Sequence, residues 1–348
     1  MDVAQAQPKV NAIPAIRRKS VHLSQASLVS TSLPENGANL PCIIQPAVDG
    51  VDLASWAKAN LEFLDSKLGI HGAILFRGFQ IDSVKTFESI AEAIYKEVYG
   101  GYGDLPRVGT SSRIYESTPY PADKHILFHN ESSHLHSWPM KISFHCVTPS
   151  KEGGETPLLD CRRICNVLDP AILRSFEEKG LVYVRNFIEG IDVSWERFFS
   201  TSDKAVVEEM CRKDQVDCEW TSNNGLRLRH RTHAVTHHPY TKEKVFFNQI
   251  QLHHPACLDT ATRESLLALY GAENLPRNVV YGDGTPIADS LMEEIGELFW
   301  KHSVALPWQQ GDMIMLDNML TSHARNPFVG ARQIVVAMGE MMRAGSYE

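Results

Sequence analysis

Long apolar runs, a basic excess and a leader-like start are all missing from this 348-residue sequence. No stretch reaches the ~18 apolar residues of a membrane span, and residues 1–20 lack the apolar core of a secretory signal. Lys and Arg number 34 against 42 Asp and Glu, and the net charge of −8 disfavours a polyanion-binding protein. These absences predict a cytoplasmic protein with no nucleic acid and no membrane as a partner.

Cysteine motifs are also missing, and no disulfide is indicated. The seven cysteines are an odd number, and they show neither a C-x-x-C pair nor the spacing of a zinc finger. Free thiols fit a reducing compartment, so cysteine usage agrees with the expected cytoplasmic location.

The composition is that of a globular protein, with 43% hydrophobic and 22% charged residues. The length exceeds the usual ~100–200 residues per domain, but jelly rolls and barrels often form one longer unit. We therefore expect a flexible tail at residues 1–20 and a single domain over residues 21–348. Helical inserts are expected around residues 190–215 and 258–300.

The apolar spacing changes along the chain. Apolar residues recur every three or four positions over Leu53–Leu68 and Val84–Val98, which predicts two helices on either side of a short strand at Gly72–Gly78. From Ile126 onward, short apolar runs are separated by turn residues. Six of these runs are Ile126–Phe128, Ile142–Val147, Leu181–Val184, Val245–Phe247, Met313–Leu316 and Gln333–Met338. Many short strands with long insertions predict a mostly β protein with helical additions, built on a double-stranded β-helix (a cupin-like jelly roll).

His129 and Glu131 are two positions apart in the segment F-H-N-E. In an extended chain, residues i and i+2 project to the same face, so an imidazole and a carboxylate could reach one point. Alone this signal is weak, because a histidine near a glutamate is common on protein surfaces.

A second histidine lies far along the chain. His323 follows the predicted strand Met313–Leu316, and Arg332 precedes the next strand nine positions later. Two histidines and one carboxylate form the facial triad of non-haem Fe(II) oxygenases, which leaves open positions for a co-substrate and O2. The sequence thus contains the donor types of such a site.

The segment Gly153-Gly154-Glu-Thr156-Pro follows the predicted strand Ile142–Val147. The glycines permit a tight turn, and Thr156 offers a hydroxyl. A hydroxyl together with the forked, permanent charge of an arginine is a sound way to hold a carboxylate. Each element alone has an ordinary structural role, as turn glycines or a surface arginine.

Together these motifs resemble the TauD/TfdA (taurine dioxygenase) family of Fe(II)/2-oxoglutarate oxygenases. The resemblance is greatest to members found with nonribosomal-peptide and related natural-product pathways, of the syringomycin aspartyl-hydroxylase type. The motifs span roughly residues 70–340. They include F-H-N-E at Phe128–Glu131, G-G-E-T-P at Gly153–Pro157, Y-V-R-N at Tyr183–Asn186, F-N-Q at Phe247–Gln249, L-P-R-N at Leu275–Asn278, and L-D-N-M-L and H-A-R-N-P-F within Leu316–Arg332.

The resemblance implies a site residue by residue. His129, Glu131 and His323 match the Fe(II) ligands of the family. Arg332 matches the arginine that pairs with the far carboxylate of the co-substrate 2-oxoglutarate, and Thr156 matches the hydroxyl that assists it. The oxidant is O2.

Two departures from the family pattern bear on this assignment. The carboxylate is Glu131, where much of the wider family has Asp, although this subgroup commonly uses Glu. The interval from His323 to Arg332 is shorter than in taurine dioxygenase, so Arg325 stays open as an alternative to Arg332. Halogenating relatives have Gly or Ala at the carboxylate position. Glu131 fills that position here and favours oxygen transfer or hydrogen abstraction.

Other polar residues could contact the substrate. Asn248 and Arg113 are our candidates, and Arg185 could likewise bind a substrate carboxylate, although ordinary structural roles are open for all three. The remaining histidines near these motifs are expected to be structural and not metal ligands: His134, His136, His237, His238, His253 and His254.

The reaction implied is hydroxylation of an amino acid, an amino-acyl group or a related small metabolite, free or tethered to a carrier protein, in natural-product biosynthesis. Desaturation, epoxidation or cyclisation would use the same cofactors. A non-catalytic binding module on the same scaffold is a different class. A zinc hydrolase is another, and it would not need the Arg/Thr pair.

Overall fold

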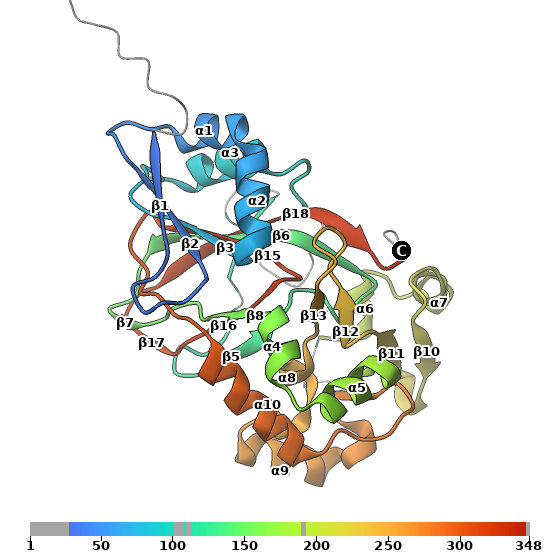
Figure 1. Cartoon of the computed structure of the whole chain (residues 1–348). Coiled ribbons are helices and arrows are strands. Elements are labelled where there is room, and N and C mark those ends of the chain that lie inside the picture. The colour runs from blue at the N-terminus through green and yellow to red at the C-terminus, as the bar shows by residue number, and fades with distance from the viewer. Residues whose placement is uncertain (1–27, 101–107, 109–112, 118, 189–192, 346–348) are drawn as a thin grey trace, which may run out of the picture.

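The computed structural model describes residues 28–100, 108, 113–117, 119–188 and 193–345. The tail expected at residues 1–20 lies outside these residues. Figure 1 shows helices above a large sheet, smaller sheets and further helices below it, and a four-stranded sheet to one side. No helix in the described part of the chain is both long and apolar enough to cross a membrane.

The large sheet has seven strands in the order β1-β2-β3-β15-β6-β18-β4. Neighbouring strands within this sheet pair in the antiparallel sense, except β2 and β3, which are parallel. The bounds are β1 (Val29–Ser32), β2 (Cys42–Pro46), β3 (Ala73–Phe76), β15 (Met313–Asp317), β6 (Ser137–Thr148), β18 (Gln333–Arg343) and β4 (Ile114–Glu116). The sheet joins strands from both ends of the chain, so the fold closes only when most of the sequence is present.

A three-stranded sheet of order β5-β16-β8 and a two-stranded ribbon, β17-β7, complete the sandwich. Their bounds are β5 (Ile126–His129), β16 (Thr321–Arg325), β8 (Leu158–Asp160), β17 (Phe328–Val329) and β7 (Glu152–Gly153). The predicted strands at Ile126–Phe128, Met313–Leu316 and Gln333–Met338 are confirmed as β5, β15 and β18, and β18 runs five residues longer than predicted, to Arg343.

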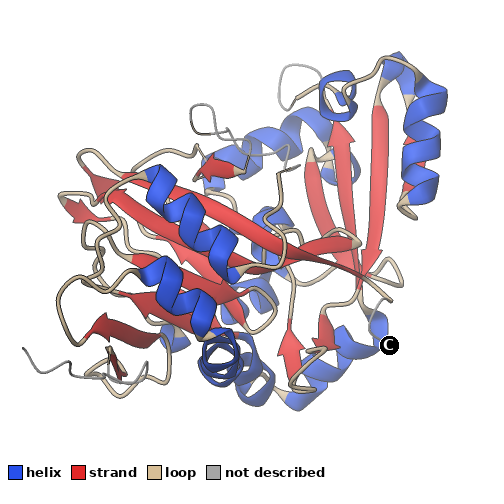
Figure 2. Ribbon diagram, turned by 90° about the horizontal axis from the view of Figure 1, so that it is seen from above, coloured by secondary structure: helices blue, strands red, loops and turns tan. Residues whose placement is uncertain are grey.

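The side chains of β15 point alternately to the two faces of the large sheet, and each face packs against a separate hydrophobic core. Met313 and Met315 pack with the helices above, whereas Ile314 and Leu316 face the interior of the sandwich. Successive side chains of a strand point to opposite faces, so a continuous apolar run indicates a sheet that is covered on both sides. Figure 2 shows helices lying across one face of the large sheet.

The helices above the large sheet differ from their prediction. The single helix expected over Leu53–Leu68 is two helices, α1 (Leu53–Ala59) and α2 (Leu61–His71), separated by Asn60. Asn60 has φ −130° and its side chain donates to the carbonyl of Trp56 at 2.7 Å. Asparagine competes with the helix backbone for hydrogen bonds, and this explains the break.

The second predicted helix, Val84–Val98, ends earlier, as α3 (Val84–Ile94). Tyr95 is extended, and its hydroxyl hydrogen-bonds that of Ser143 on β6. Val98 then forms a β-bridge with Gly339. Apolar periodicity continues past Ile94, but tertiary pairing with the sheet ends the helix.

A four-stranded sheet beside the sandwich has the order β10-β11-β9-β14. Only β9 (Leu181–Phe187) was predicted; β10 (Asp217–Trp220), β11 (Leu226–Thr232) and β14 (Arg277–Tyr281) were not. Two short helices, α6 (Trp195–Phe199) and α7 (Lys204–Lys213), precede it in the expected helical insert. The predicted strand Val245–Phe247 is confirmed as β13 (Lys244–Phe246), paired with β12 (Val235–His237).

Five further helices lie below and around the small sheets. They are α4 (Cys161–Val167), α5 (Pro170–Lys179), α8 (Ile250–His253), α9 (Thr260–Tyr270) and α10 (Asp289–His302). Short 3₁₀ turns occupy Ser222–Asn224, Pro255–Cys257 and Ala272–Asn274. Phe299 of α10 packs with Phe128 of β5 at 5.8 Å between ring centroids, so α10 covers the strand that carries His129.

A buried ion pair ties β3 to the turn before β15. Arg77 donates from Nε to Asp312 Oδ1 at 3.0 Å and from Nη2 to Oδ2 at 2.6 Å. Asp312 is 1% exposed, and its carboxylate also accepts the N–H of Gln309 at 2.8 Å. Removing one partner of a buried pair leaves an uncompensated charge in a poorly solvated place.

We expect Arg77→Met to lower the free energy of unfolding by about 3 kcal/mol, because Asp312 would stay buried without its cation. Urea unfolding followed by circular dichroism measures the loss. Arg212→Met is the matched control: Arg212 pairs with Glu209 at 2.6 Å in an exposed position and should change nothing measurable. Equal effects of the two substitutions would contradict this account.

Candidate metal centre and its two cavities

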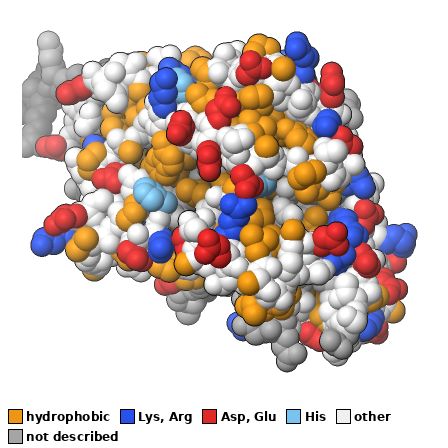
Figure 3. Space-filling view, turned by 90° about the horizontal axis from the view of Figure 1, so that it is seen from below, with side chains coloured by type: hydrophobic (Ala, Val, Ile, Leu, Met, Phe, Trp, Pro, Cys, Tyr) orange, Lys and Arg blue, Asp and Glu red, His pale blue; other side chains and the backbone are white. Residues whose placement is uncertain are grey.

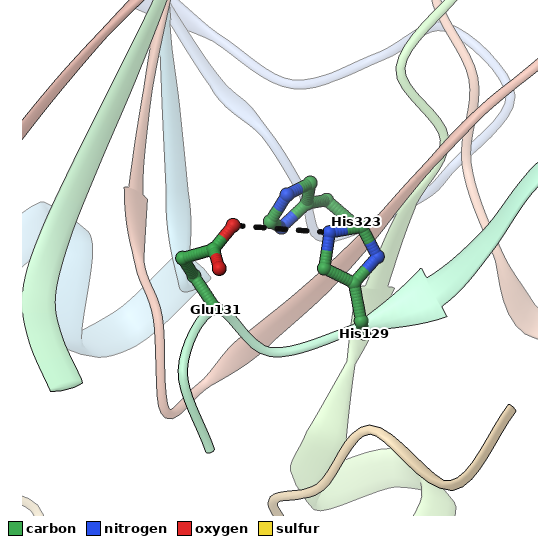
Figure 4. A group of neighbouring side chains, drawn as sticks. All are labelled: His129, Glu131 and His323. Carbon is green, nitrogen blue, oxygen red and sulfur yellow. Dashed lines mark ion pairs between the residues drawn. The ribbon is translucent and has the colours of Figure 1, made fainter. Parts of the chain in front are cut away.

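Pairing of β5 with β16 brings together residues that are far apart in the sequence. His323 is the register partner of His129, and their ring centroids are 4.3 Å apart. Glu131 follows two residues after His129, and its Oε2 lies 4.0 Å from His129 Nε2. One ligand atom from each of the three side chains lies within 4.8 Å of the others. Figure 4 shows the carboxylate and both imidazoles converging on one point.

The protonation states of the two histidines suit a metal. His129 Nδ1 is 2.8 Å from the carbonyl oxygen of Leu127, so Nδ1 carries the proton and Nε2 is left with its lone pair. Burial, and then the nearby His129, lower the pKa of His323 well below its usual value. Its Nδ1 is buried without a hydrogen-bond partner among the described residues. Two imidazoles beside one carboxylate are a donor set that fits Fe(II).

Asn318 fixes the backbone of Glu131. Its Oδ1 accepts the N–H of Glu131 at 2.8 Å, and its Nδ2 donates to the carbonyls of Glu131 and Pro139, both at 2.9 Å. Its own carbonyl accepts a hydrogen bond from Asn130 at 2.6 Å. Asn318 has no exposed surface. The turn that leads to His323 therefore holds both Asn130, which lies between the first two ligands, and the backbone of Glu131.

That turn is itself held by Asp317. Its Oδ1 accepts the N–H groups of Met319 and Leu320, both at 2.9 Å. Its Oδ2 is 3.0 Å from Nε2 of buried His238, and the other ring nitrogen of His238 accepts the N–H of Thr241 at 3.0 Å. Nε2 of neutral His238 thus carries the proton and donates it to Asp317. This places His238 in a structural role, as expected.

An inner cavity opens from the three residues into the sandwich. It is lined by Thr156, Arg325 and Arg332 as well as by apolar side chains of β6 and β18. The Thr156 hydroxyl accepts a hydrogen bond from Trp308 Nε1 at 3.3 Å. Arg332 donates from Nε to the carbonyl of Gly154 at 2.9 Å. Burial, and then nearby Arg325, lower the pKa of Arg332 to about 10, so it is a cation at neutral pH.

The glycine pair of the G-G-E-T-P segment makes room for this arginine. Gly154 has φ +73°, and a Cβ there would lie 3.0 Å from Cδ of Arg332 and 2.5 Å from the hydroxyl of Ser150. Gly154 therefore permits both the left-handed backbone and the close passage of the Arg332 side chain.

The two arginines of the inner cavity differ in what they bind. Arg325 donates to the carbonyls of Tyr120, Pro121 and Lys124 at 2.5–3.1 Å, so its terminal nitrogens anchor the segment before β5. The terminal nitrogens of Arg332 make no hydrogen bond to the described residues, and its guanidinium lies 5.5 Å from the ring centroid of Phe328. The geometry favours Arg332 over Arg325 as the group free to take an anion.

An outer cavity lies against two of these three residues, His129 and Glu131. It has a free volume of about 340 Å³, against about 50 Å³ for the inner one, and the two cavities share Ile126, His129 and Glu131. Part of its remaining wall comes from the four-stranded sheet and includes Tyr183 and Arg185. The inner and outer cavities thus meet at His129 and Glu131.

The remaining predicted residues lie elsewhere. Asn248 is buried; its Oδ1 accepts the N–H of Ile250 at 3.3 Å and its Nδ2 donates to Ala234, so its amide serves the backbone. Arg113 pairs with Glu92 at 2.7 Å and lines neither cavity. Arg185 does line the outer cavity, and so does Gln249, the residue after Asn248.

Sequence reasoning missed several residues of this region. His230 and Arg277 line the outer cavity but belong to strands that were not predicted. Asn318, which belongs to the motif L-D-N-M-L, and Trp308 were assigned no role from the sequence. The signal that could have found Asn318 is the turn between two apolar runs, because turn asparagines often bind nearby backbone.

Comparison with known proteins identifies relatives. A family profile described as "Taurine catabolism dioxygenase TauD, TfdA family" matches residues 34–338. The dapdiamide synthesis protein DdaC of Enterobacter agglomerans is 38% identical over 276 residues, which are 79% of this chain and 84% of that protein. A clavaminate synthase-like protein of Arabidopsis thaliana is 28% identical over 344 residues, 91% of this chain and 99% of that one.

A solved structure supports the fold. PvcB of Pseudomonas aeruginosa, described as an Fe, alpha-ketoglutarate dependent oxygenase from an isonitrile synthetic pathway, superimposes with a TM-score of 0.53 at 14% identity. The match covers 94% of this chain and 98% of PvcB. The predicted fold class, a jelly roll with helical additions, is confirmed.

We expect Asn318→Ala to weaken Fe(II) binding about 10- to 100-fold, because residues that orient metal ligands have effects of this size. Equilibrium titration of the protein with Fe(II) under anaerobic conditions measures the change. Asn60→Ala, in the break between α1 and α2, removes an amide far from the site and should leave Fe(II) affinity unaltered. Unchanged affinity in Asn318→Ala would show that the Glu131 backbone needs no such support.

Proposed function

The chain belongs to the TauD/TfdA family, and from this premise we propose that it hydroxylates an unactivated C–H bond of an amino acid, an amino-acyl group or a related small metabolite. It is an Fe(II)/2-oxoglutarate-dependent oxygenase, and its co-substrates are 2-oxoglutarate and O2. The 38% identity to a dapdiamide synthesis protein supports a role in natural-product biosynthesis. The observation that carries the proposal is the convergence of His129, Glu131 and His323.

Each residue has a distinct role in this proposal. His129, Glu131 and His323 hold the iron, while Arg332 and Thr156 bind the far carboxylate of 2-oxoglutarate in the inner cavity. When bound, the iron, 2-oxoglutarate and O2 supply the oxidising power, and 2-oxoglutarate leaves as succinate and CO2. The charge-assisted hydrogen bonds of an arginine fork would fix the orientation of the co-substrate.

The protein's own contribution is placement and the exclusion of water. Apolar side chains of β6 and β18, among them Ile142, Phe144 and Val336, line the inner cavity opposite the ligands. Such walls keep water from the reacting groups. Because the outer cavity meets the same ligands, a substrate there would present its C–H bond to the metal while 2-oxoglutarate occupies the inner space.

Desaturation, epoxidation and cyclisation remain alternative outcomes, since they would need the same ligands and co-substrates. Glu131 occupies the position that is Gly or Ala in halogenating relatives, so oxygen transfer or hydrogen abstraction is preferred. A zinc hydrolase would leave Arg332 and Thr156 without a role, and a non-catalytic binding module would have no need of three converging ligands.

Location and partners are part of the proposal. Seven free cysteines support a cytoplasmic, reducing environment. On the face shown in Figure 3, acidic and basic side chains are interspersed, without a broad area of one sign. This mixed charge supports a small-molecule substrate, free or bound to a carrier protein. A nucleic-acid partner would instead favour a basic surface.

Succinate release should require Fe(II), 2-oxoglutarate and O2 together, and a chelator should stop it. Glu131→Ala should lower this turnover at least a hundredfold, because the iron loses its only anionic protein ligand. Glu209→Ala, an exposed carboxylate on α7, is the control and should turn over normally. Full activity of Glu131→Ala, or hydrolysis that runs with zinc and without O2, would refute the proposed function.

Arg332→Met should raise the 2-oxoglutarate concentration for half-maximal succinate release ~10- to 100-fold, the usual size of a lost charge-assisted hydrogen bond. Arg325→Met should instead lower the thermal stability, because it releases the carbonyls of Tyr120, Pro121 and Lys124. If Arg325→Met produced the larger change in the 2-oxoglutarate requirement, the roles of the two arginines would be reversed.

A further inference from the structure

Three histidines from different parts of the chain line the outer cavity. His230 lies on β11 opposite Tyr183 of β9, His253 ends α8, and His134 lies in the turn after Glu131. The ring centroid of His134 is 5.1 Å from that of His253 and 6.2 Å from that of His230. We call this cluster of His134, His230 and His253 the histidine patch.

The histidine patch is polar but uncharged. Burial, followed by nearby His253, lowers the pKa of His134 well below its usual value. Burial, followed by Arg277, lowers the pKa of His253 to about 3. Burial, followed by His136, lowers the pKa of His230 to about 4. All three rings are therefore neutral at physiological pH, and each has one N–H donor and one lone pair.

The surroundings of each ring indicate which nitrogen carries the proton. Nδ1 of His134 and Nδ1 of His230 are buried and lack a hydrogen-bond partner among the described residues. A buried N–H without an acceptor is rarer than an unpaired acceptor, so both rings carry the proton on Nε2. Nδ1 of His253 instead donates to the carbonyl of Gln249 at 3.2 Å, so its Nε2 keeps the lone pair. Through Nε2, the histidine patch thus offers two donors and one acceptor.

The spacing of the histidine patch requires a group with two polar atoms. Among the histidines, cysteines and carboxylates that the structure describes, only His129, Glu131 and His323 bring three ligand atoms within 4.8 Å of one another. The nitrogens of the histidine patch are therefore more widely spaced. Three partners of one hydroxyl oxygen lie about 4.7 Å apart, for bonds of about 2.9 Å at tetrahedral angles. A primary carboxamide, which spreads its acceptor and its N–H donors over two atoms, fits the wider spacing.

A carboxylate fits the histidine patch less well. It has no N–H group for His253, so its lone pairs would lie against that of Nε2. Two cations also line the cavity, but both are already engaged. The guanidinium of Arg185 lies 4.6 Å from the ring centroid of Phe187 and 4.5 Å from that of Phe198, and Arg277 has interactions of its own. The donors and the acceptor of the histidine patch therefore favour a neutral polar group.

Gln249 connects the histidine patch with the iron-binding segment. Its backbone N–H donates to the hydroxyl of Tyr183 at 2.9 Å, and its carbonyl accepts the N–H of His253. Its Nε2 donates to the carbonyl of Asn130, the residue between the first two ligands, at 3.0 Å. Gln249 is buried. These hydrogen bonds hold the histidine patch at a set distance from the metal ligands, so a group bound there would place the rest of its molecule relative to the iron.

We propose that the histidine patch binds a primary carboxamide of the substrate: His134 and His230 donate to its oxygen, and His253 accepts from its nitrogen. The inference rests on the proposed function, which it extends from reaction type to substrate class. The substrate is then an amino acid, an acyl group or a related metabolite that carries a carboxamide, with its reacting C–H bond on the side of His129 and Glu131.

The test uses three probes of nearly the same shape: hexanamide, methyl pentyl ketone, which lacks the N–H group, and hexanoate, which is charged. The protein is loaded with Fe(II) and saturating 2-oxoglutarate without O2, and binding is measured by calorimetry. Hexanamide should bind at least about tenfold more tightly than either of the other two, because each leaves a polar group of the cavity unpaired. Equal affinities, tighter binding of hexanoate, or no detectable binding of hexanamide would overturn the proposal.

Variants locate the effect. His253→Asn keeps a donor for the carbonyl of Gln249 but removes the acceptor Nε2, so the preference for hexanamide over the ketone should disappear. His230→Phe should weaken hexanamide binding at least fivefold, and His230→Gln, which keeps an N–H donor near Nε2, should restore part of the affinity. His237→Phe is the matched control, because His237 is exposed on β12 and does not line the cavity. An amide preference that survives in His253→Asn, or unaltered hexanamide affinity in His230→Phe, would overturn the assignment.

Failure of this inference differs from failure of the proposed function. Amide-selective binding in a protein that releases no succinate would support the carboxamide site and reject the oxygenase assignment. Turnover dependent on Fe(II) and 2-oxoglutarate, in a protein that binds the amide and the ketone equally, would do the reverse.

Discussion

The register between β5 and β16 is the constraint on which the site depends. It sets His323 opposite His129, and cross-strand neighbours are only about 5 Å apart. A slip of one residue would turn the side chain of His323 to the other face. The register is held on the far edge of β16 by β8, and at its start by the turn in which Asp317 and Asn318 bind backbone groups.

The same turn holds the backbone of Glu131, although Glu131 is not part of a strand. It lies beyond the end of β5, where the chain already turns through Ser132 at φ 57°. Its backbone is paired with the side chain of Asn318 in place of a neighbouring strand. One short connection between β15 and β16 therefore supplies both the support for one ligand and the path to another, and this couples the geometry of all three.

Local patterns revealed much of this site and little of its surroundings. The i, i+2 spacing of His129 and Glu131 and the apolar runs of β5 and β15 are local signals, so they can be read directly. Register is not local. The strand β11 was missed because its sequence, L-R-L-R-H-R-T, alternates apolar with charged residues and then turns wholly polar, which hides a strand whose two faces serve a cavity and solvent. Asn60 broke a helix that periodicity alone would continue.

Arg332 lines the inner cavity, and its burial limits which anion it can take. Arg332 is half-buried, and removal from water penalises its charge, as its lowered pKa indicates. An anion that enters the inner cavity compensates that cost, so a compact acid with a second chelating end gains most there. Arg325, the other arginine of this cavity, donates to the carbonyls of Tyr120, Pro121 and Lys124. Arg332 is therefore the cation of the inner cavity that suits the co-substrate.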